Sequence, residues 1–225
     1  MYGAAMHDIA THFAKIQQEL AELRLSAPPC VIGASKTMEV PVLEAAIAAG
    51  VRHFGENKIQ EAAGKWPALR DAHPDITLHG IGPVQSNKVE DALALFDVMH
   101  TIDRPKLVSA IAKARDKGVA MRTKQFLVQV NTGEEPQKAG VLPSALPALL
   151  QQCADTELTI DGLMCIPPAG TPAAPHFALL RKLAERHGLR ELSMGMSADY
   201  GLAARMGATM VRVGTSLFGP RDTKV

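Results

Sequence analysis

Cysteine is scarce in this chain, and the three residues present, Cys30, Cys153 and Cys165, form no CxxC pair. An odd, widely spaced set supports neither a disulfide framework nor a zinc knuckle. Long apolar runs are also absent, since none approaches the ~18–20 residues that a membrane-spanning helix needs. The N-terminal stretch MYGAAMHDIATHF lacks the basic start and apolar segment of a signal peptide. We therefore expect a cytoplasmic protein with no membrane segment.

An excess of charge of one sign is missing as well. The chain has 24 Lys and Arg residues against 23 Asp and Glu residues, which gives a formal net charge of +1. Without a basic surplus, we expect no bulk attraction to nucleic acid or to a membrane surface. The hydrophobic content of 47% is ordinary for a globular protein and too high for a disordered one.

Short apolar runs alternate with helical patterns along the whole chain. From Met6 to about Arg24, apolar residues recur at three- and four-residue steps, which predicts an amphipathic opening helix. The predicted strands are Val31–Ser35, Arg52–Gly55, Thr77–Ile81, Val98–Thr101, Gln125–Asn131, Thr159–Ile166, Glu191–Met196 and Met210–Gly214. The predicted helices between them are Val40–Ala49, Ile59–Leu69, Asn87–Phe96, Pro105–Lys117, Leu146–Ala154, Pro175–His187 and Tyr200–Met206.

This alternation defines the fold class that we expect. Gly50, Gly118, Gly188 and Gly207 each follow a helical pattern, where glycine favours a left-handed cap. Strands joined by crossover helices pair in parallel, and eight such units predict a (β/α)₈ TIM barrel with an extra N-terminal helix. A doubly wound open sheet is the alternative. Because no linker or low-complexity segment divides the chain, we expect residues 1–225 to form a single domain.

In a barrel of this kind the chemistry lies at the C-terminal ends of the strands. Lys36 follows the apolar run CVIGAS, so its side chain could point into the barrel mouth. Desolvation there would favour the free amine, which can form a Schiff base with an aldehyde. A solvated lysine at the end of a strand is the alternative interpretation of this residue.

A second group of residues predicts a phosphate site. Ser197 follows the seventh predicted strand, and Gly214 and Thr215 follow the eighth. Phosphate binds where glycine lets the backbone approach and where N–H groups and hydroxyls converge, and barrels often place such sites after strands seven and eight. Two tight turns with helix caps are the alternative. Together with Lys36, the pattern favours a phosphorylated aldehyde cofactor lying across the mouth.

Several segments resemble one known family in sequence. VIGASKTMEV, HFGENKIQEA, LHGIGPVQSNK, VQVNTGEEPQKAGV, GLMCIPP and LSMGMSADYGLAARMGATMVRVGTSLFGPRD are similar to segments of the pyridoxal phosphate homeostasis proteins. These proteins resemble a free-standing N-terminal barrel domain of alanine racemase. The similar segments run in order from about residue 31 to residue 222.

The resemblance implies a role for each candidate residue. Lys36 would carry pyridoxal 5′-phosphate (PLP) as a Schiff base, and Arg212 would face the pyridine nitrogen. Asn57 would contact the face or edge of the cofactor. The phosphate would be bound by the three residues already noted after strands seven and eight, namely Ser197, Gly214 and Thr215. The similar racemase segment has an arginine in the same place. Because an arginine cannot readily give up a proton, it leaves the ring a weak electron sink, which suits a carrier or at most a restrained racemase.

Other chemistry-bearing residues have simpler interpretations. His79 lies inside a predicted strand and is interpreted as a packed core histidine rather than as an acid or base. Cys165 lies in an apolar strand without a basic neighbour that would activate it. Gly80 stands where similar sequences often have a bulky residue, which indicates altered packing at the third strand.

Three functions fit these observations. The first is a PLP-binding protein of intracellular PLP homeostasis that limits free cofactor or passes it to PLP-dependent enzymes without efficient turnover. The second is a PLP-dependent amino-acid racemase, which needs a base on each face of the substrate adduct. Alanine racemase takes one of these bases from a tyrosine in a second domain. We do not expect such a domain after Val225. Neither Tyr2 nor Tyr200 lies in a matching motif. The third is a Schiff-base aldolase, which would be purified without a chromophore. We expect a monomer.

Overall fold

The computed structural model describes residues 2–220, with side chains from residue 8 onward. Within this range, eight parallel strands close into a barrel in the order β1 to β8, so the open-sheet alternative is wrong and the predicted barrel is confirmed. The strands are β1 Cys30–Ala34, β2 His53–Glu56, β3 Thr77–Gly80, β4 Val98–Ile102, β5 Gln125–Gln129, β6 Gly162–Met164, β7 Glu191–Met196 and β8 Met210–Val213.

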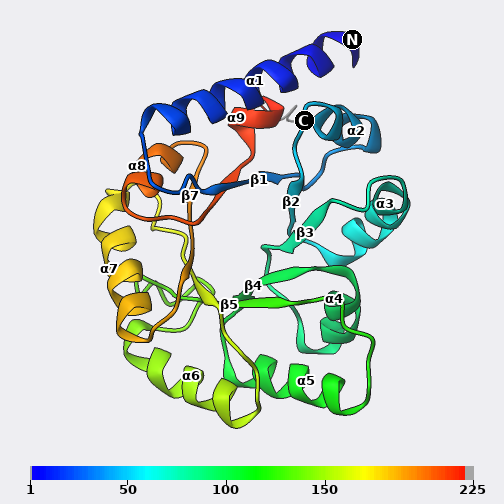
Figure 1. Cartoon of the computed structure of the whole chain (residues 1–225). Helices are drawn as coiled ribbons and strands as arrows, with labels where there is room; N and C mark the ends of the chain where they lie inside the picture. Colours follow the sequence, from blue (N-terminus) through cyan, green and yellow to red (C-terminus); the bar gives the residue numbers. More distant parts are fainter. Residues whose placement is uncertain (1, 221–225) are drawn as a thin grey trace.

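Helices surround the barrel, as Figure 1 shows. The helices that connect successive strands are α2 Val40–Ala48, α3 Ile59–Ala72, α4 Val89–Leu95, α5 Pro105–Asp116, α6 Leu146–Asp155, α7 Ala173–Arg186 and α8 Tyr200–Arg205. Two short 3₁₀ turns, η1 Ser86–Lys88 and η2 Pro143–Ala145, precede α4 and α6. All four predicted glycine caps, Gly50, Gly118, Gly188 and Gly207, have positive φ, which confirms that these helices end in left-handed turns.

The extra N-terminal helix is also present, as α1 Tyr2–Glu22. Its apolar stripe of Ile9, Phe13, Ile16 and Leu20 is buried. This stripe faces α2, α8 and the short helix α9, Thr215–Phe218, beside which α1 runs in Figure 1. The helix thereby covers the region where the first strand, β1, pairs with the last strand, β8. None of the helices within residues 2–220 combines the length and apolar character needed to cross a membrane.

Three predicted elements differ from the structure. The strand predicted over Thr159–Ile166 is paired only over Gly162–Met164, and the strand predicted over Gln125–Asn131 ends at Gln129. The helix predicted over Asn87–Phe96 begins as a 3₁₀ turn and becomes α-helical only at Val89. The helix α9 was missed because a helix of four residues shows no apolar periodicity.

Glycines let parts of the barrel approach closely. A Cβ atom on Gly80 would lie 2.8 Å from the Phe96 ring, so this glycine makes room for the aromatic side chain and has a packing role. A Cβ atom on Gly162 would lie 2.1 Å from the carbonyl oxygen of Glu191 on the neighbouring strand. By contrast, Gly64 on α3 has open space where a side chain would be.

These surroundings predict opposite effects for the same substitution at two glycines. We expect Gly162→Ala to lower the free energy of unfolding by about 1–3 kcal/mol, because the backbone of β7 must move. We expect Gly64→Ala to raise it by about 0.5–1 kcal/mol, because alanine is the better helix former. Urea denaturation measures both. A Gly162→Ala protein as stable as the wild type would contradict this account of how β6 and β7 pack.

Candidate functional site

The predicted site residues gather at the C-terminal end of the barrel. Lys36 lies in a turn, two residues beyond the end of β1. The sequence analysis predicted a strand that continues to Ser35, directly before Lys36. The other residues occupy or follow the ends of three strands: Asn57 after β2, Ser197 after β7, Arg212 in β8, and Gly214 and Thr215 directly after β8. Because β8 pairs with β1, the last strand closes the barrel beside the turn of Lys36.

The turn that contains Lys36 is fixed by hydrogen bonds from the buried ammonium group of Lys65. Lys65 of α3 donates hydrogen bonds to the backbone oxygens of Ser35 and Met38, at 3.1 and 3.3 Å. The backbone N–H of Thr37, which has a φ of 66°, donates to Glu61 at 2.6 Å. The backbone on both sides of Lys36 is thus fixed by helix α3.

Lys65 is itself paired with a fully buried carboxylate. Its Nζ lies 2.9 Å from Oε1 of Glu56, the last residue of β2. The same oxygen accepts hydrogen bonds from the Ser35 hydroxyl at 2.7 Å and from the Trp66 indole at 3.0 Å. The other oxygen, Oε2, is buried without a hydrogen-bond partner among the described residues. A polar network therefore connects β1, β2 and α3 directly beneath the turn.

The Lys36 side chain is half-buried, and its ammonium group forms no hydrogen bond or ion pair with the described residues. Lys65, by contrast, uses its ammonium group entirely for structural contacts. Of these two lysines, Lys36 is the one that is available for chemistry.

Ser197 joins the two loops at the end of the barrel. Its hydroxyl oxygen accepts hydrogen bonds from the backbone N–H groups of Gly214 and Ser216, at 3.1 and 3.3 Å. The Ser216 hydroxyl donates in return to the Ser197 carbonyl oxygen at 3.2 Å. The structure therefore brings together Ser197 and Gly214, as predicted, and adds Ser216, whose role the sequence analysis missed.

The start of α9 remains open toward a ligand. Thr215 is exposed, and its hydroxyl has no hydrogen-bond partner within the described chain. A Cβ atom on Gly214 would lie 3.7 Å from the Cβ of Ala34, so the protein itself leaves room for a side chain there. Ser197 and Thr215 also line a groove of about 630 Å³ that reaches toward α1.

Arg212 is buried inside the barrel, with 4% of its surface exposed. Its Nη1 donates to the Ser193 hydroxyl at 2.5 Å, and its Nη2 donates to the Cys165 carbonyl oxygen at 2.8 Å. Burial lowers the pKa of the guanidinium, and the neighbouring Cys165 and Asp199 oppose that shift. An arginine stays charged at neutral pH even so, and its five N–H groups exceed these two contacts.

Apolar side chains flank Arg212 at the rim. Met196, the last residue of β7, is the register partner of Arg212 and is 37% exposed. Ile166, which follows β6, is 39% exposed. Large apolar side chains that remain this accessible beside a buried cation could contact the face of a planar ring.

Asn57 is placed by the adjoining loop. A Cβ atom on Gly82 would lie 2.2 Å from the Asn57 carbonyl oxygen, so the backbone after β3 reaches Asn57 only because residue 82 is glycine. The Asn57 side chain is half-buried and forms no hydrogen bond within the described residues. Its predicted contact with a ligand stays a prediction.

The interpretation of His79 agrees with the structure, whereas Cys165 lies just beyond β6 and does have a basic neighbour, Arg212. His79 is buried and bonded to two other imidazoles, and it lies within the barrel rather than at its mouth. Burial outweighs the effect of Arg212 on the Cys165 thiol. It raises the pKa of this thiol to about 12, which leaves it protonated and unreactive at neutral pH.

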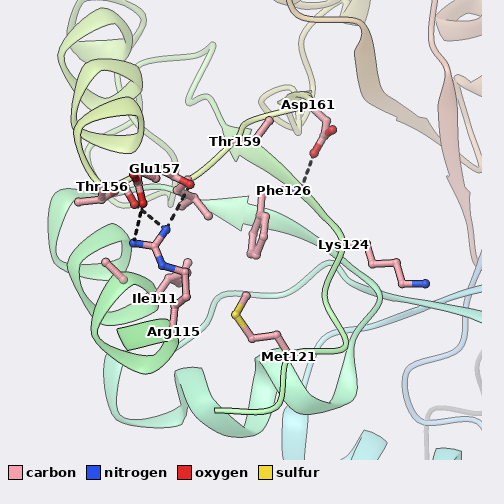
Figure 2. Close-up of a pocket in the computed structure, with 11 residues that line it drawn as sticks. Ile111, Arg115, Met121, Lys124, Phe126, Thr156, Glu157, Thr159 and Asp161 are labelled. Carbon is pink, nitrogen blue, oxygen red and sulfur yellow. Dashed lines mark hydrogen bonds and ion pairs between the residues drawn. The ribbon is translucent and has the colours of Figure 1, made fainter. Parts of the chain in front are cut away.

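A separate hollow lies at the opposite end of the barrel, shown in Figure 2. It measures about 230 Å³ and adjoins the first residues of β5 and the segment before β6. The Arg115 side chain in its wall donates to the carbonyl oxygens of Thr156 and Glu157, at 2.8 and 3.2 Å. Asp161 accepts a hydrogen bond from the Phe126 N–H. These polar groups are satisfied by the protein, so this hollow offers no comparable chemistry.

The family described as alanine racemase, N-terminal domain, matches residues 9–222. This match spans nearly the whole chain and both ends of the candidate site. The chain belongs to this family. Within it, the pyridoxal phosphate homeostasis protein of Pseudomonas aeruginosa is 40% identical over 96% of this chain and 97% of its own length. The corresponding protein of Vibrio cholerae is 38% identical over 95% of this chain and 94% of its own length.

Two kinds of solved structure resemble this protein, one in sequence and fold and the other in fold. PipY of Synechococcus elongatus PCC7942, solved with PLP bound, is 39% identical, has a TM-score of 0.75, and is matched over 90% of this chain and 99% of its own. Alanine racemase of Clostridium difficile 630 is 15% identical with a TM-score of 0.71. The match covers 96% of this chain but 57% of the racemase. The racemase therefore shares the fold, at a much greater distance in sequence.

The buried pair of Lys65 and Glu56 predicts a large effect on stability. We expect Lys65→Met to lower the free energy of unfolding by about 3–5 kcal/mol, because it leaves the Glu56 carboxylate buried without a counter-charge. The control is Lys117→Met, which removes an exposed ion pair with Glu90 and should cost about 0–1 kcal/mol. Urea denaturation compares the two. Equal, small effects would show that Lys65 does not hold this network together.

Proposed function

We propose that this protein binds PLP covalently through Lys36 and serves intracellular PLP homeostasis, by limiting free cofactor or delivering it to PLP-dependent enzymes. One observation carries the proposal: a lysine without a protein partner, an exposed threonine hydroxyl beside a glycine turn, and a buried guanidinium lie at one end of the barrel. The relatives named for PLP homeostasis and the PLP-bound PipY structure support it.

The residues at the mouth fit PLP in charge and shape. When bound, PLP supplies an aldehyde that condenses reversibly with a primary amine. Lys36 offers an amine that no described residue occupies, on a turn that Lys65 and Glu61 hold in place. Because contacts within the protein fix the turn, little conformational entropy would be lost when the amine reacts.

At the phosphate end, the Thr215 hydroxyl would donate to the anion beside the backbone of Gly214. Gly214 permits a close approach because its missing side chain leaves the space beside Ala34 open. The Thr215 hydroxyl is exposed and without a protein partner. Ser197 holds the two loops together through its bonds to the N–H groups of Gly214 and Ser216.

Arg212 would donate a hydrogen bond to the pyridine nitrogen, and the exposed Met196 and Ile166 would contact the ring. Since the guanidinium keeps its protons, it would orient the ring without protonating it. A ring held in this way withdraws electrons weakly, which favours storage and transfer over rapid turnover.

The amino-acid racemase remains the second candidate. Tyr200 does not supply the second base, because its hydroxyl donates to Glu19 of α1. Burial and this carboxylate raise the pKa of Tyr200 to about 12, so the hydroxyl stays protonated at neutral pH. The side chain of Tyr2 lies outside the described residues. Rapid racemisation of any amino acid by the purified protein would favour this second candidate.

We further propose a single-domain monomer that acts in the cytoplasm. Support comes from the continuous barrel and from Cys30, Cys153 and Cys165, which are all free thiols, as expected in a reducing compartment. The racemase-like alternative would instead need partner surfaces that complete its site.

The first test concerns the amine. We expect Lys36→Ala to abolish the visible absorption band of the PLP-loaded protein, because no other lysine is expected to react at the mouth. Contacts to the phosphate should leave weak, noncovalent binding. The matched control is Lys58→Ala, an exposed lysine that follows β2 at the same end of the barrel, which should keep the band. A Lys36→Ala protein that retains the full band would refute the assignment.

The second test concerns the phosphate. We expect Gly214→Ala to weaken PLP binding by about tenfold or more, equivalent to about 1.4 kcal/mol, because the new methyl group enters the space left for the anion. The protein should still fold, since the methyl group meets Ala34 at an ordinary contact distance of 3.7 Å. Gly64→Ala, which fills open space on α3 away from this groove, is the control. The phosphate site would be wrong if pyridoxal, which lacks the phosphate, bound the wild type as tightly as PLP.

A further inference from the structure

Five polar side chains form an unbroken chain of hydrogen bonds through the barrel. His53 Nδ1 lies 3.1 Å from His79 Nε2, and His79 Nδ1 lies 2.9 Å from His100 Nε2. His100 Nδ1 lies 2.8 Å from the Ser193 hydroxyl, which in turn accepts from Arg212 at 2.5 Å. The chain thus connects β2, β3, β4, β7 and β8.

Strand register brings the three imidazoles together. The register partner of His79 is Gly55, two residues beyond His53. The register partner of Val98 is His79, and His100 lies two residues beyond Val98. Each histidine is therefore displaced by two residues from the preceding one, which keeps all three side chains on the inner face of the sheet.

The donor at one end fixes the direction of every bond in the chain. Arg212 can only donate, so the Ser193 oxygen is an acceptor toward it. The single hydroxyl proton of Ser193 is then free to be donated to His100 Nδ1. A neutral His100 carries its proton on Nε2 and donates it to His79, and His79 donates in the same manner to His53.

The opposite direction leaves a buried group unsatisfied. If His100 donated to Ser193, the Ser193 oxygen would accept two bonds, and its own proton would have no acceptor among the hydrogen bonds of the described residues. Ser193 has no exposed surface, so water cannot replace that acceptor. The one-way arrangement from Arg212 to His53 therefore satisfies more groups.

Burial keeps the inner imidazoles neutral. It lowers the pKa of His79 to about 3, with a further lowering from His53. It lowers the pKa of His100 well below its usual value, and both His79 and Arg212 act in the same direction. At neutral pH each of these two rings therefore has one proton, as the one-way arrangement requires.

The outer end of the chain opens toward a groove. His53, the first residue of β2, is half-buried and lines a hollow of about 430 Å³ together with Cys30 and Arg52. Burial lowers the pKa of His53, and Asp97 partly opposes this. Arg52 is paired with Asp75, and burial raises the pKa of the Cys30 thiol to about 12, so neither group supplies a free charge there.

We propose that His53, His79 and His100 are positioning residues that act through Ser193 to hold Arg212, and that they couple the groove at the N-terminal end of the barrel to the mouth. This proposal rests on the proposed function only for the role of Arg212 toward PLP. A hydroxyl that donates to an imidazole becomes a stronger acceptor, so the chain strengthens the bond that orients the guanidinium.

The first experiment reads the tautomers without any cofactor. In ¹⁵N-histidine NMR of the cofactor-free protein at pH 7, we expect His53, His79 and His100 all to be neutral with the proton on Nε2. The variant His53→Ala removes the last acceptor and should shift the side-chain nitrogens of His79 and His100. The control is His73→Ala, at a half-buried histidine that is not part of this chain of hydrogen bonds. This variant should leave the side-chain nitrogens of His79 and His100 unchanged.

Two results would contradict the proposed direction of this chain of hydrogen bonds. One is a proton on Nδ1, or a charged ring, at His79 or His100 in the wild type. The other is a folded His53→Ala protein in which the nitrogens of both His79 and His100 are unmoved. If that variant does not fold, the wild-type tautomers alone decide.

The second experiment tests whether this chain of hydrogen bonds affects PLP binding at the mouth of the barrel. In Ser193→Ala, we expect the PLP dissociation constant to rise roughly fivefold to tenfold, as for the loss of one hydrogen bond, and the pH profile of the visible band to shift. Unchanged affinity and an unchanged pH profile would refute the coupling. If the wild type fails to bind PLP at all, the proposed function is wrong, while the tautomer measurement still tests the direction of this chain of hydrogen bonds.

Discussion

The burial of one cation, Arg212, constrains much of this barrel. A charge inside a protein is tolerated only when hydrogen-bond acceptors surround it. The interiors of such barrels are ordinarily filled with branched apolar side chains. Here Ser193 and the Cys165 carbonyl oxygen accept from the guanidinium, and a row of histidines continues from Ser193. A row of polar side chains consequently crosses the inside of the barrel, from the start of β2 to Arg212.

The same end of the barrel shows how distant parts of the sequence are brought into one site. Closure of β8 against β1 places Gly214 beside Ala34, two residues before Lys36. Helix α3 then fixes the turn of Lys36 through Lys65, and Ser197 fixes the loops after β7 and β8. The turn of Lys36 and the loops after β7 and β8 are therefore each held by contacts within the protein.

Much of this arrangement could be predicted from the sequence, and the exceptions have physical causes. Alternating apolar runs and helical patterns sufficed for the barrel, because crossover helices force parallel pairing. Positions at the ends of strands predict the roles of Lys36 and of the phosphate group Ser197, Gly214 and Thr215, whereas the role of Arg212 is implied only by resemblance. The structure brings all five residues to one end of the barrel. The structural role of Lys65 was not predicted, because a lysine on a helix is ordinarily exposed, and only packing against β2 buries it beside Glu56. His79 was interpreted correctly as buried, but its bonds to His53 and His100 depend on the register of three strands.

On this account a single lysine, Lys36 in the turn after β1, binds PLP covalently. The most direct measurement is borohydride reduction of the PLP-loaded protein, followed by proteolysis and mass spectrometry of the labelled peptides. The account predicts one stoichiometric label, on the peptide that contains Lys36, with the other lysines essentially unmodified. A label spread over several exposed lysines, or concentrated on a lysine other than Lys36, would contradict it.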